Sequence, residues 1–400
     1  MAALSRAAMV LTMMGLAATS ALSQPSLISM TTDVPLPDGL SYDFHALSCN
    51  NLQNMVREAV QGAMARDAGV VPGLLRLFFH DCFPQGCDAS ILLTGGNSEQ
   101  NMPQNGGLRR SGKQTERLLR HDPTCSHHPT ASDRGLARAT KTLDTTWPQR
   151  GLSTLLAIQK HETRKEDKVN NNMLDLIESI RATVHRACGP TVSCADITSL
   201  ATKEAVMQSR LPGYDVPLGR RDSLAPATAQ QVGILPGPDF NVQQLVRNFA
   251  DRGFDKMDLV ALSGAHTVGK ASCGSFRNRA GENADFVRML QQVCARNPGH
   301  LQDLDVTTPN TFDNRYFNNL QMGRGVLNSD MALTHDGETK NWVNNFAGNQ
   351  GWFFSQFSTS MRKLAHLPGG NIGEIRNNCF RRNGNGESVF LAAEVFAAFA

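Results

Sequence analysis

Two side chains that can handle protons and charged oxygen lie four residues apart in this 400-residue sequence, Arg76 and His80. Residues at this spacing share one face of a helix. A histidine is a natural general base near neutral pH, and an arginine one turn away can stabilise negative charge that develops on a bound oxygen. The pair stands in an apolar stretch from Leu74 to Phe79, where an isolated charge is costly. This context favours a reactive site over a solvent-facing pair.

The turn after this predicted helix combines carboxylate, hydroxyl and carbonyl oxygens, from Asp81, Gly86, Asp88 and Ser90. Such a mixture of oxygen ligands suits calcium. The spacing differs from that of an EF-hand, and a surface turn with scattered acidic residues is the alternative for this stretch alone. Cys82 and Cys87 bracket the turn and could close it into a small loop.

A second histidine, His266, follows an apolar helical pattern in the motif SGAHTVG. A lone histidine near an apolar face is commonly a satisfied core residue. As a metal ligand it would need an acceptor that fixes its tautomer. Asp330 is a candidate for that acceptor, but spacing alone leaves both interpretations open.

The elements that must position these residues are almost all helical. Apolar residues recur with the three- and four-residue spacing of helices, and Asn241 with Gln244 resembles a capping box. Asp255 can cap the helix that runs toward His266. Convincing β alternation is nearly absent, so we expect a mainly α fold. The predicted helices cover 52–64, 74–83, 174–184, 194–208, 241–252, 255–266, 284–294, 312–322, 340–347 and 352–366.

Charge and the N-terminus limit the classes of partner. The formal net charge of +3 is small, and no basic stripe interleaved with aromatic residues occurs, so we expect no nucleic-acid partner. Arg6 precedes an apolar run that ends in a small-x-small pattern before Gln24. We therefore predict a cleaved signal peptide at 1–23 and no membrane association after cleavage. A membrane anchor is the alternative, but the apolar run is short for a bilayer.

The chain has nine cysteines. A secretory route makes disulfides the default, and the odd count leaves one thiol over. Zinc is the competing interpretation, but no CxxC pair occurs and no pair of histidines matches Cys82 and Cys87.

Two segments do not fit a compact helical domain. Residues 112–172 are rich in Thr, Arg, Lys and His and show little apolar rhythm. A loop of this length without its own structure is uncommon inside a domain, so we expect a disordered insertion or a translated intron. Residues 384–400 end in an apolar stretch and form a predicted C-terminal extension. An apolar tail of this kind is similar to vacuolar sorting extensions.

The motifs together resemble those of the secreted plant (class III) haem peroxidases over about residues 40–111 and 173–383. The resemblance implies a two-lobed, all-helical fold with haem between distal and proximal halves. It also implies that 24–383 form one haem peroxidase domain, which the insertion interrupts. The motifs that carry it are LSYDFHALSC, LLRLFFHDCFPQGCDASILL, TVSCADI, VPLGRRDS, LPGP, LSGAHTVGKASC, TTPNTFDNRYFNNL, LNSD and IRNNCF.

The resemblance implies roles on both sides of the haem. On the distal side His80 matches the base, Arg76 the distal arginine and Phe79 the aromatic residue between them and the haem edge. Asn105 matches the asparagine that orients the base, although QNGGLRR departs from the usual motif there.

On the proximal side His266 matches the iron ligand, and Asp330 matches the carboxylate that hydrogen-bonds it. Pro236, in LPGP, matches the residue that lines the donor site.

The resemblance also implies two calcium sites and four disulfides. The distal calcium site would use Asp81, Asp88, Ser90, the carbonyls of Pro84 and Gly86, and Glu99 through water. The proximal site would use Thr267, Asp305, Thr308, Asp313 and the carbonyl of Thr311. The implied disulfides are Cys49–Cys188, Cys82–Cys87, Cys194–Cys379 and Cys273–Cys294, which leaves Cys125 inside the insertion.

The function that the resemblance implies is a secreted, monomeric peroxidase with one haem b and two calcium ions. It would reduce hydrogen peroxide, oxidise small phenolic donors by one-electron steps and take part in the response to oxidative stress. Cell wall and vacuole are both possible destinations. The alternative is an inactive or haem-free scaffold that binds at the wall, because the insertion follows Asn105 and could displace its loop. An intracellular peroxidase type fits poorly with a signal peptide and eight pairable cysteines.

Overall fold

A computed structural model describes residues 35–108, 173–281, 283–370 and 372–384. The predicted signal peptide at 1–23 and the predicted insertion at 112–172, with Cys125, lie outside the described residues. So does the predicted C-terminal extension, apart from Gly384.

The prediction of a mainly α fold is confirmed. Helices cover most of the described chain, and residues 173–188 are also helical. None of the helices in the described ranges is both long enough and apolar enough to cross a membrane. The labelled α-helices are α1 (Leu52–Met64), α2 (Val70–Gln85), α5 (Cys194–Gln208), α6 (Ala229–Val232), α7 (Val242–Ala250), α8 (Lys256–Ser263), α9 (Cys273–Phe276), α10 (Ala284–Arg296), α11 (Arg315–Gln321), α12 (Asn328–Ala332), α13 (Gly337–Gly348) and α14 (Gln350–Ala365).

Short 3₁₀ turns connect several of these helices, and two of them adjoin the predicted reactive residues. The 3₁₀ turns are η1 (Ser90–Leu92), η2 (Glu99–Asn101), η3 (Pro103–Asn105) and η4 (Gly264–Thr267). Turn η3 ends on Asn105, and η4 carries His266 directly after α8.

Two predicted helix starts are confirmed as capping boxes. Asn241 accepts a hydrogen bond from the backbone of Gln244, and the Gln244 side chain accepts one from the backbone of Asn241. Asp255 and Asp258 make the same reciprocal pair at the start of α8. Each arrangement satisfies two backbone donors that a helix N-terminus otherwise leaves without partners. The start of α8 therefore fixes where η4 and His266 emerge.

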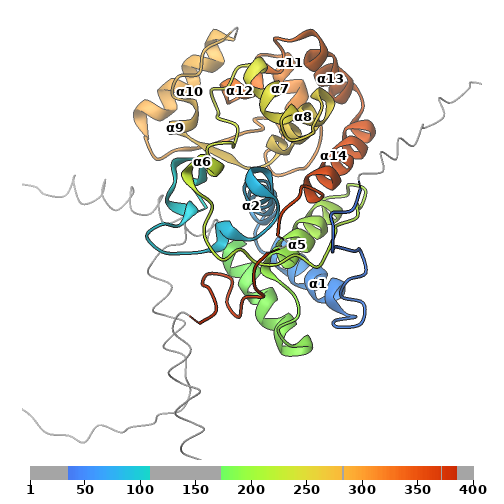
Figure 1. Cartoon of the computed structure of the whole chain (residues 1–400). Coiled ribbons are helices and arrows are strands. Elements are labelled where there is room, and N and C mark those ends of the chain that lie inside the picture. Colours follow the sequence, from blue (N-terminus) through green and yellow to red (C-terminus); the bar gives the residue numbers. More distant parts are fainter. Residues whose placement is uncertain (1–34, 109–172, 282, 371, 385–400) are drawn as a thin grey trace, which may run out of the picture. The chain divides into compact units, whose positions relative to one another are not determined.

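Helix α5 is a buried centre for the first part of the chain. It packs against both α1 and α2, as Figure 1 shows. Most of its residues are buried, which explains why its apolar pattern has no single stripe. Helix α8 is the corresponding centre for later elements, because α7, α13 and α14 all contact it. Helices α2 and α8 thus supply rigid supports for Arg76, His80 and His266.

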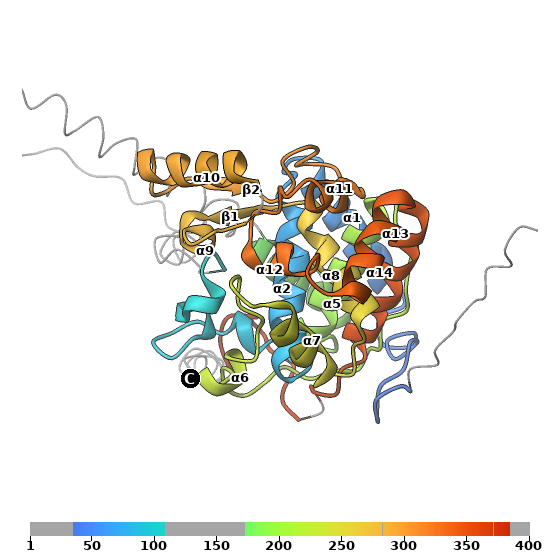
Figure 2. The ribbon, with the colours of Figure 1, turned by 90° about the horizontal axis from the view of Figure 1, so that it is seen from above.

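A two-stranded antiparallel sheet was not predicted. Strand β1 (Lys270–Ser272) lies beside β2 (Leu301–Asp303) (Figure 2). The two strands pair with Lys270 opposite Asp303. Strands of three residues are too short to show the alternation by which strands are recognised in a sequence.

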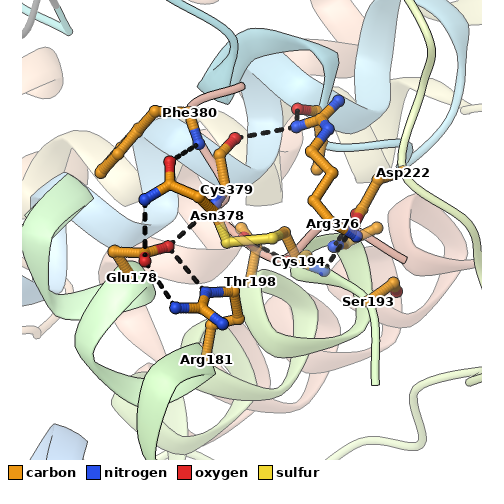
Figure 3. Close-up of a disulfide and its surroundings, with 12 residues drawn as sticks. Glu178, Arg181, Ser193, Cys194, Thr198, Asp222, Arg376, Asn378, Cys379 and Phe380 are labelled. Atoms are coloured by element: carbon orange, nitrogen blue, oxygen red, sulfur yellow. Dashed lines mark hydrogen bonds and ion pairs between the residues drawn. A yellow bond between two sulfur atoms is a disulfide. The ribbon is translucent and has the colours of Figure 1, made fainter. Parts of the chain in front are cut away.

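The described chain contains the four disulfides that the resemblance implies: Cys49–Cys188, Cys82–Cys87, Cys194–Cys379 and Cys273–Cys294. The third joins the first residue of α5 to the C-terminal segment (Figure 3). Glu178 supports this connection, because its carboxylate accepts the backbone N–H of Cys379 and the side-chain amide of Asn378. Arg181 holds the same carboxylate through two hydrogen bonds.

Gly264 allows η4 to pack closely on α14. A Cβ atom at this position would lie 2.4 Å from the ring of Phe353 and 2.9 Å from the ring of Phe317. Both rings are fully buried and lack space to move. The glycine in SGAHTVG therefore brings the backbone that carries His266 against the aromatic core.

We predict that Gly264→Ala lowers the free energy of unfolding by about 1–3 kcal/mol, because the added methyl group overpacks the Phe353 contact. The matched control is Gly348→Ala at the end of α13, where a Cβ atom meets nothing within 4 Å. Urea denaturation of the full chain measures both changes. Equal stabilities of the two variants would contradict this account of the glycine.

Candidate active site

The predicted reactive residues from distant parts of the sequence line one cavity of about 420 Å³. Its walls come from α2, the loop at 235–238, η4, β1 and α12. Arg76 and His80 reach this lining from α2, whereas His266 reaches it from η4 and Asp330 from α12. Leucine and phenylalanine side chains supply much of the remaining surface. The sequence pattern placed Arg76 and His80 on one predicted helix and His266 at the end of another, and the structure brings all of them together with Asp330.

His80 is held by a buried amide. Its Nδ1 lies 2.6 Å from Oδ1 of Asn105, and the Nδ2 amide of Asn105 donates to the carbonyl of Glu99 at 3.0 Å. An amide oxygen can only accept, so the proton is on Nδ1 of His80, and Nε2 keeps its lone pair. The structure therefore places Asn105 where the resemblance implies, despite the unusual local sequence.

The surroundings of His80 favour its neutral form. Burial is the main cause that lowers the pKa of His80 to about 3, and the nearby positive charge of Arg76 lowers it further. The hydrogen bond with Asn105 acts in the opposite direction. A neutral imidazole with a free ring nitrogen can accept a proton.

Arg76 reaches from α2 to the loop that carries Asn105. Its guanidinium donates to the carbonyls of Gln104 and Gly106 at 3.1 and 3.2 Å. The side chain is exposed because it lines the open cavity, yet desolvation by the surrounding protein lowers its pKa to about 10. At neutral pH it is a fixed cation on the same wall as His80.

His266 is the second histidine of the cavity. Its Nδ1 lies 2.7 Å from Oδ1 of the buried Asp330, whose Oδ2 accepts the backbone N–H of Leu327 at 3.1 Å. A ring nitrogen that donates to a carboxylate leaves Nε2 available as a metal ligand. The arrangement supports the metal-ligand interpretation over a satisfied core histidine.

Tyr316 also contacts this pair, although no local sequence pattern selected it as a site residue. Its hydroxyl donates to Oδ1 of Asp330 at 2.9 Å, and its ring meets the His266 ring edge to face with centroids 6.1 Å apart. Burial is the main cause that raises the pKa of Tyr316 well above its usual value, and the charge of Asp330 adds to the effect.

Phe79 and Pro236 also line the cavity. The Phe79 ring stacks on Phe83, with centroids 4.6 Å apart, and contacts Phe249. Lys270 and Ser272 on β1 are polar lining residues that sequence reasoning missed. A short polar strand carries no signal that would have identified them.

The turn that directly follows α2 brings several buried oxygen-bearing side chains together. Asp81, Asp88, Ser90 and Glu99 are all buried. Burial is the main cause that raises the pKa of Asp81 well above its usual value, and the charges of Asp88 and Glu99 add to it. Burial likewise raises the pKa values of Asp88 and Glu99. Oδ1 of Asp81 has no hydrogen-bond partner among the described residues.

This cluster fits a bound cation. Three buried carboxylates repel one another, and a divalent cation would offset both the repulsion and the desolvation. Within the described ranges, no group of three His, Cys, Asp or Glu side chains is arranged to hold a metal by itself. A calcium ion draws on hydroxyl and carbonyl oxygens as well, so it suits this mixed set better than a transition metal.

Two other expected ligands of this site are carbonyls. Gly86 ends α2 with a φ of +88° and approaches residue 368 so closely that a Cβ atom would lie 2.1 Å from the carbonyl oxygen of Pro368. The carbonyl of Pro84 accepts a hydrogen bond from Arg252, so the structure directs this oxygen to a guanidinium.

The second set of expected calcium ligands also comes together, directly after His266. Oγ1 of Thr267 lies 3.2 Å from Oδ2 of Asp305 and 3.4 Å from Oδ1 of Asp313. Oγ1 of Thr308 lies 3.1 Å from Asp313, and the Thr311 carbonyl lies 3.5 Å from Thr267. Carboxylate, hydroxyl and carbonyl oxygens at these distances match the ligand types of calcium.

A buried arginine that sequence reasoning missed connects the first oxygen cluster to the C-terminal disulfide. The guanidinium of Arg376 donates to the carbonyl of Cys379 at 2.9 Å (Figure 3). It also donates to the carbonyl of Ala89 at 2.9 Å and to that of Ser223 at 2.7 Å. Ala89 lies between Asp88 and Ser90 and has a φ of +55°, which is an uncommon conformation for a residue with a side chain. Arg376 therefore holds the turn in a specific shape.

Asp222 extends this connection to α5. Its carboxylate accepts the backbone N–H groups of Cys194, Ala195 and Arg376 (Figure 3). One carboxylate thus holds both the start of α5 and the C-terminal segment, which are the two segments that the Cys194–Cys379 disulfide joins.

Comparisons with known proteins agree with the site. A family model described as peroxidase matches residues 56–125 and 111–349. The cationic peroxidase SPC4 of Sorghum bicolor is 37% identical over 369 residues, which cover 89% of this chain and 85% of the relative. Peroxidase 12 of Arabidopsis thaliana is 34% identical over 364 residues, which cover 88% and 85%. Peroxidase 22.3 of Oryza sativa is 33% identical over 380 residues, which cover 92% and 100%.

We predict that Arg376→Lys lowers the free energy of unfolding by about 2–4 kcal/mol, because one ammonium group cannot replace the guanidinium at three carbonyls. The matched control, Arg247→Lys, changes an exposed residue of α7 and should stay within about 0.5 kcal/mol of the parent protein. Urea denaturation in the presence of calcium gives both values. A loss of less than about 0.5 kcal/mol for Arg376→Lys would show that Arg376 does not hold the turn.

Proposed function

Because this chain belongs to the plant (class III) peroxidase family, we propose that it is a haem b enzyme that reduces hydrogen peroxide while it oxidises small phenolic donors in one-electron steps. The family makes it a peroxidase with a haem cofactor. The phenolic class of donor and the one-electron steps are our proposal.

The observation that carries the proposal is the pair of differently held histidines in one cavity. His80 donates from Nδ1 to a neutral amide, Asn105, whereas His266 donates from Nδ1 to a carboxylate, Asp330. A neutral acceptor leaves the first ring a proton-accepting base. A charged acceptor makes the second ring a stronger electron donor to a metal. This asymmetry suits one histidine for proton transfer and the other for iron.

The cavity fits haem. Its apolar lining suits the flat ring, and the free Nε2 of His266 is the ligand type that haem iron takes in peroxidases. A bound haem would supply the redox-active iron at which peroxide is reduced and donors are oxidised.

The protein residues handle the protons and the charge. Reduction of one hydrogen peroxide to two waters takes two electrons and two protons, and two phenol molecules each supply one electron and one proton. His80 would take a proton from one peroxide oxygen through Nε2 and return it to the departing oxygen. Arg76, fixed beside it, would stabilise the negative charge on that oxygen. Asn105 keeps the other ring proton of His80 on Nδ1, so that Nε2 is the nitrogen that takes the proton and then returns it.

The other proposed residues position the reactants. Asp330 orients His266 and raises its basicity. Phe79 covers the wall beside His80, and Pro236 lines the side of the cavity where we place the donor.

We also assign calcium to the two oxygen clusters. The first would use Asp81, Asp88, Ser90, the carbonyl of Gly86, and Glu99 through water. The expected Pro84 carbonyl is left out of this set, because it accepts a hydrogen bond from Arg252. The second would use Thr267, Asp305, Thr308, Asp313 and the Thr311 carbonyl. Asn105 bonds to the carbonyl of Glu99, so the first site would steady the acceptor of His80.

The proposed setting is extracellular. The described disulfides suit an oxidising compartment, and we propose a secreted monomer that contributes to the response to oxidative stress. A haem-free scaffold is the less favoured alternative, because the loop with Asn105 contacts His80 directly.

Reconstitution of the full chain with haem and calcium tests the catalytic proposal. We expect peroxide-dependent oxidation of a phenol such as guaiacol, and we expect His80→Ala to lower the rate of the peroxide reaction about 10²–10⁴-fold, because the general base is lost. His335→Ala is the matched control, since His335 is exposed and lies outside the cavity lining. Haem binding without turnover in the parent chain would overturn the proposed function, and an undiminished rate in His80→Ala would overturn the role of His80.

Calcium removal tests the ion sites. Saturation of one site at a hundredfold excess over its Kd stabilises the fold by about 2.7 kcal/mol, so a calcium chelator should lower Tm, and added calcium should restore it. Asp81→Asn should reduce the calcium content by one ion per chain. Asp38→Asn, at an exposed residue, should leave it unchanged. A chain that holds no calcium would refute the assignment.

A further inference from the structure

One oxygen of Asp330 accepts two hydrogen bonds. Oδ1 lies 2.7 Å from Nδ1 of His266 and 2.9 Å from the hydroxyl of Tyr316. A carboxylate can only accept, so the tyrosine hydroxyl is the donor. Two donors thus compete for the charge on a single oxygen.

Tyr316 carries a hydroxyl at a buried aromatic position, although most aromatic residues of this chain are phenylalanines. The sequence has 19 phenylalanines and three tyrosines. Tyr316 stands beside Phe317, and both are buried in the aromatic cluster of α11 and α14. A phenylalanine at this position would keep the ring packing and avoid the burial of a polar group. Packing alone therefore does not explain the hydroxyl of Tyr316, and its hydrogen bond to Asp330 does.

The other two tyrosines lie in different environments. The hydroxyl of Tyr214 is buried without a hydrogen-bond partner among the described residues. Tyr42 is only partly buried and bonds to His366, at 3.0 Å. The position on α11 is thus the one that brings a phenol to the carboxylate behind His266.

We propose that Tyr316 is a positioning residue that limits how strongly Asp330 draws the Nδ1 proton of His266, and that it thereby raises the reduction potential of the haem iron. The proposal rests on the proposed function of His266 as the haem ligand. It adds a residue that the motif comparison did not assign to the site.

The physical basis is competition for the negative charge of Oδ1. With both donors in place, the carboxylate shares its charge, and the proton stays closer to His266. Without the phenol, the bond from His266 strengthens, and the ring gains anionic character. A more anionic ligand stabilises ferric over ferrous iron. The hydroxyl therefore acts against the effect of Asp330 and tunes it.

The test compares haem-loaded parent chain with Tyr316→Phe, which removes only the hydroxyl. We expect the ferric-to-ferrous equilibrium to shift about tenfold toward ferric iron, which corresponds to a midpoint potential lower by about 59 mV for one electron. The stretching frequency of the iron–histidine bond in the ferrous protein should rise. Tyr214→Phe is the matched control, because it removes a buried hydroxyl that has no described contact with Asp330, and both readouts should stay unchanged.

A second background separates the hydroxyl effect from a packing effect. In Asp330→Asn the charge on the acceptor is lost, so Tyr316→Phe should cause little further change in potential. An equal shift in both backgrounds would overturn the proposal. Labelling of the three tyrosines with 3-fluorotyrosine, a stronger donor, should raise the potential, and this measurement does not depend on the folding of a variant.

The outcomes distinguish the two levels of the argument. A parent chain that binds no haem through His266 would overturn the proposed function and this proposal together. A parent chain with haem on His266, but with the same potential in Tyr316→Phe, would overturn the role of Tyr316 alone.

Discussion

The two cavity histidines depend on one constraint: a buried acceptor holds Nδ1 of each ring and leaves Nε2 free. The acceptors are Asn105 for His80 and Asp330 for His266. The two acceptors differ in charge, and this difference favours different chemistry at each ring. A neutral amide leaves His80 suited to act as a base, whereas a carboxylate makes His266 better suited as a metal ligand. Much of the described structure around the cavity fixes these two acceptors in place.

The acceptor of His80 belongs to a larger polar assembly. Asn105 bonds to the carbonyl of Glu99, and the Glu99 carboxylate belongs to the buried oxygen cluster after α2. Arg376 holds that turn through Ala89 and holds the C-terminal disulfide through Cys379. The buried oxygen cluster, the C-terminal disulfide and the tautomer of His80 are therefore connected by short, buried contacts. This connection explains how residues far from the cavity can influence it.

The sequence predicted the helices well, because helical spacing and the capping residues Asn241 and Asp255 are local signals. It placed Arg76 and His80 on one face of a helix for the same reason. The residues alone made Asp330 only a candidate partner of His266, since 64 residues separate the two, and the family resemblance was needed to favour this pairing. Tyr316, Arg376 and the strand β1 could not be identified, because their roles depend on tertiary contacts that no local pattern records. The division of the chain at 1–23, 112–172 and 384–400 remains a prediction.

Titration of the haem-free chain with haem, followed by its visible and electron paramagnetic resonance spectra, tests the central claim most directly. The different acceptors of the two rings predict one haem per chain with His266 as the sole protein ligand, and therefore a predominantly high-spin ferric spectrum. His80 should stay unligated, because Asn105 orients it as a base. A low-spin spectrum with both histidines on the iron, or no stoichiometric binding, would contradict the account.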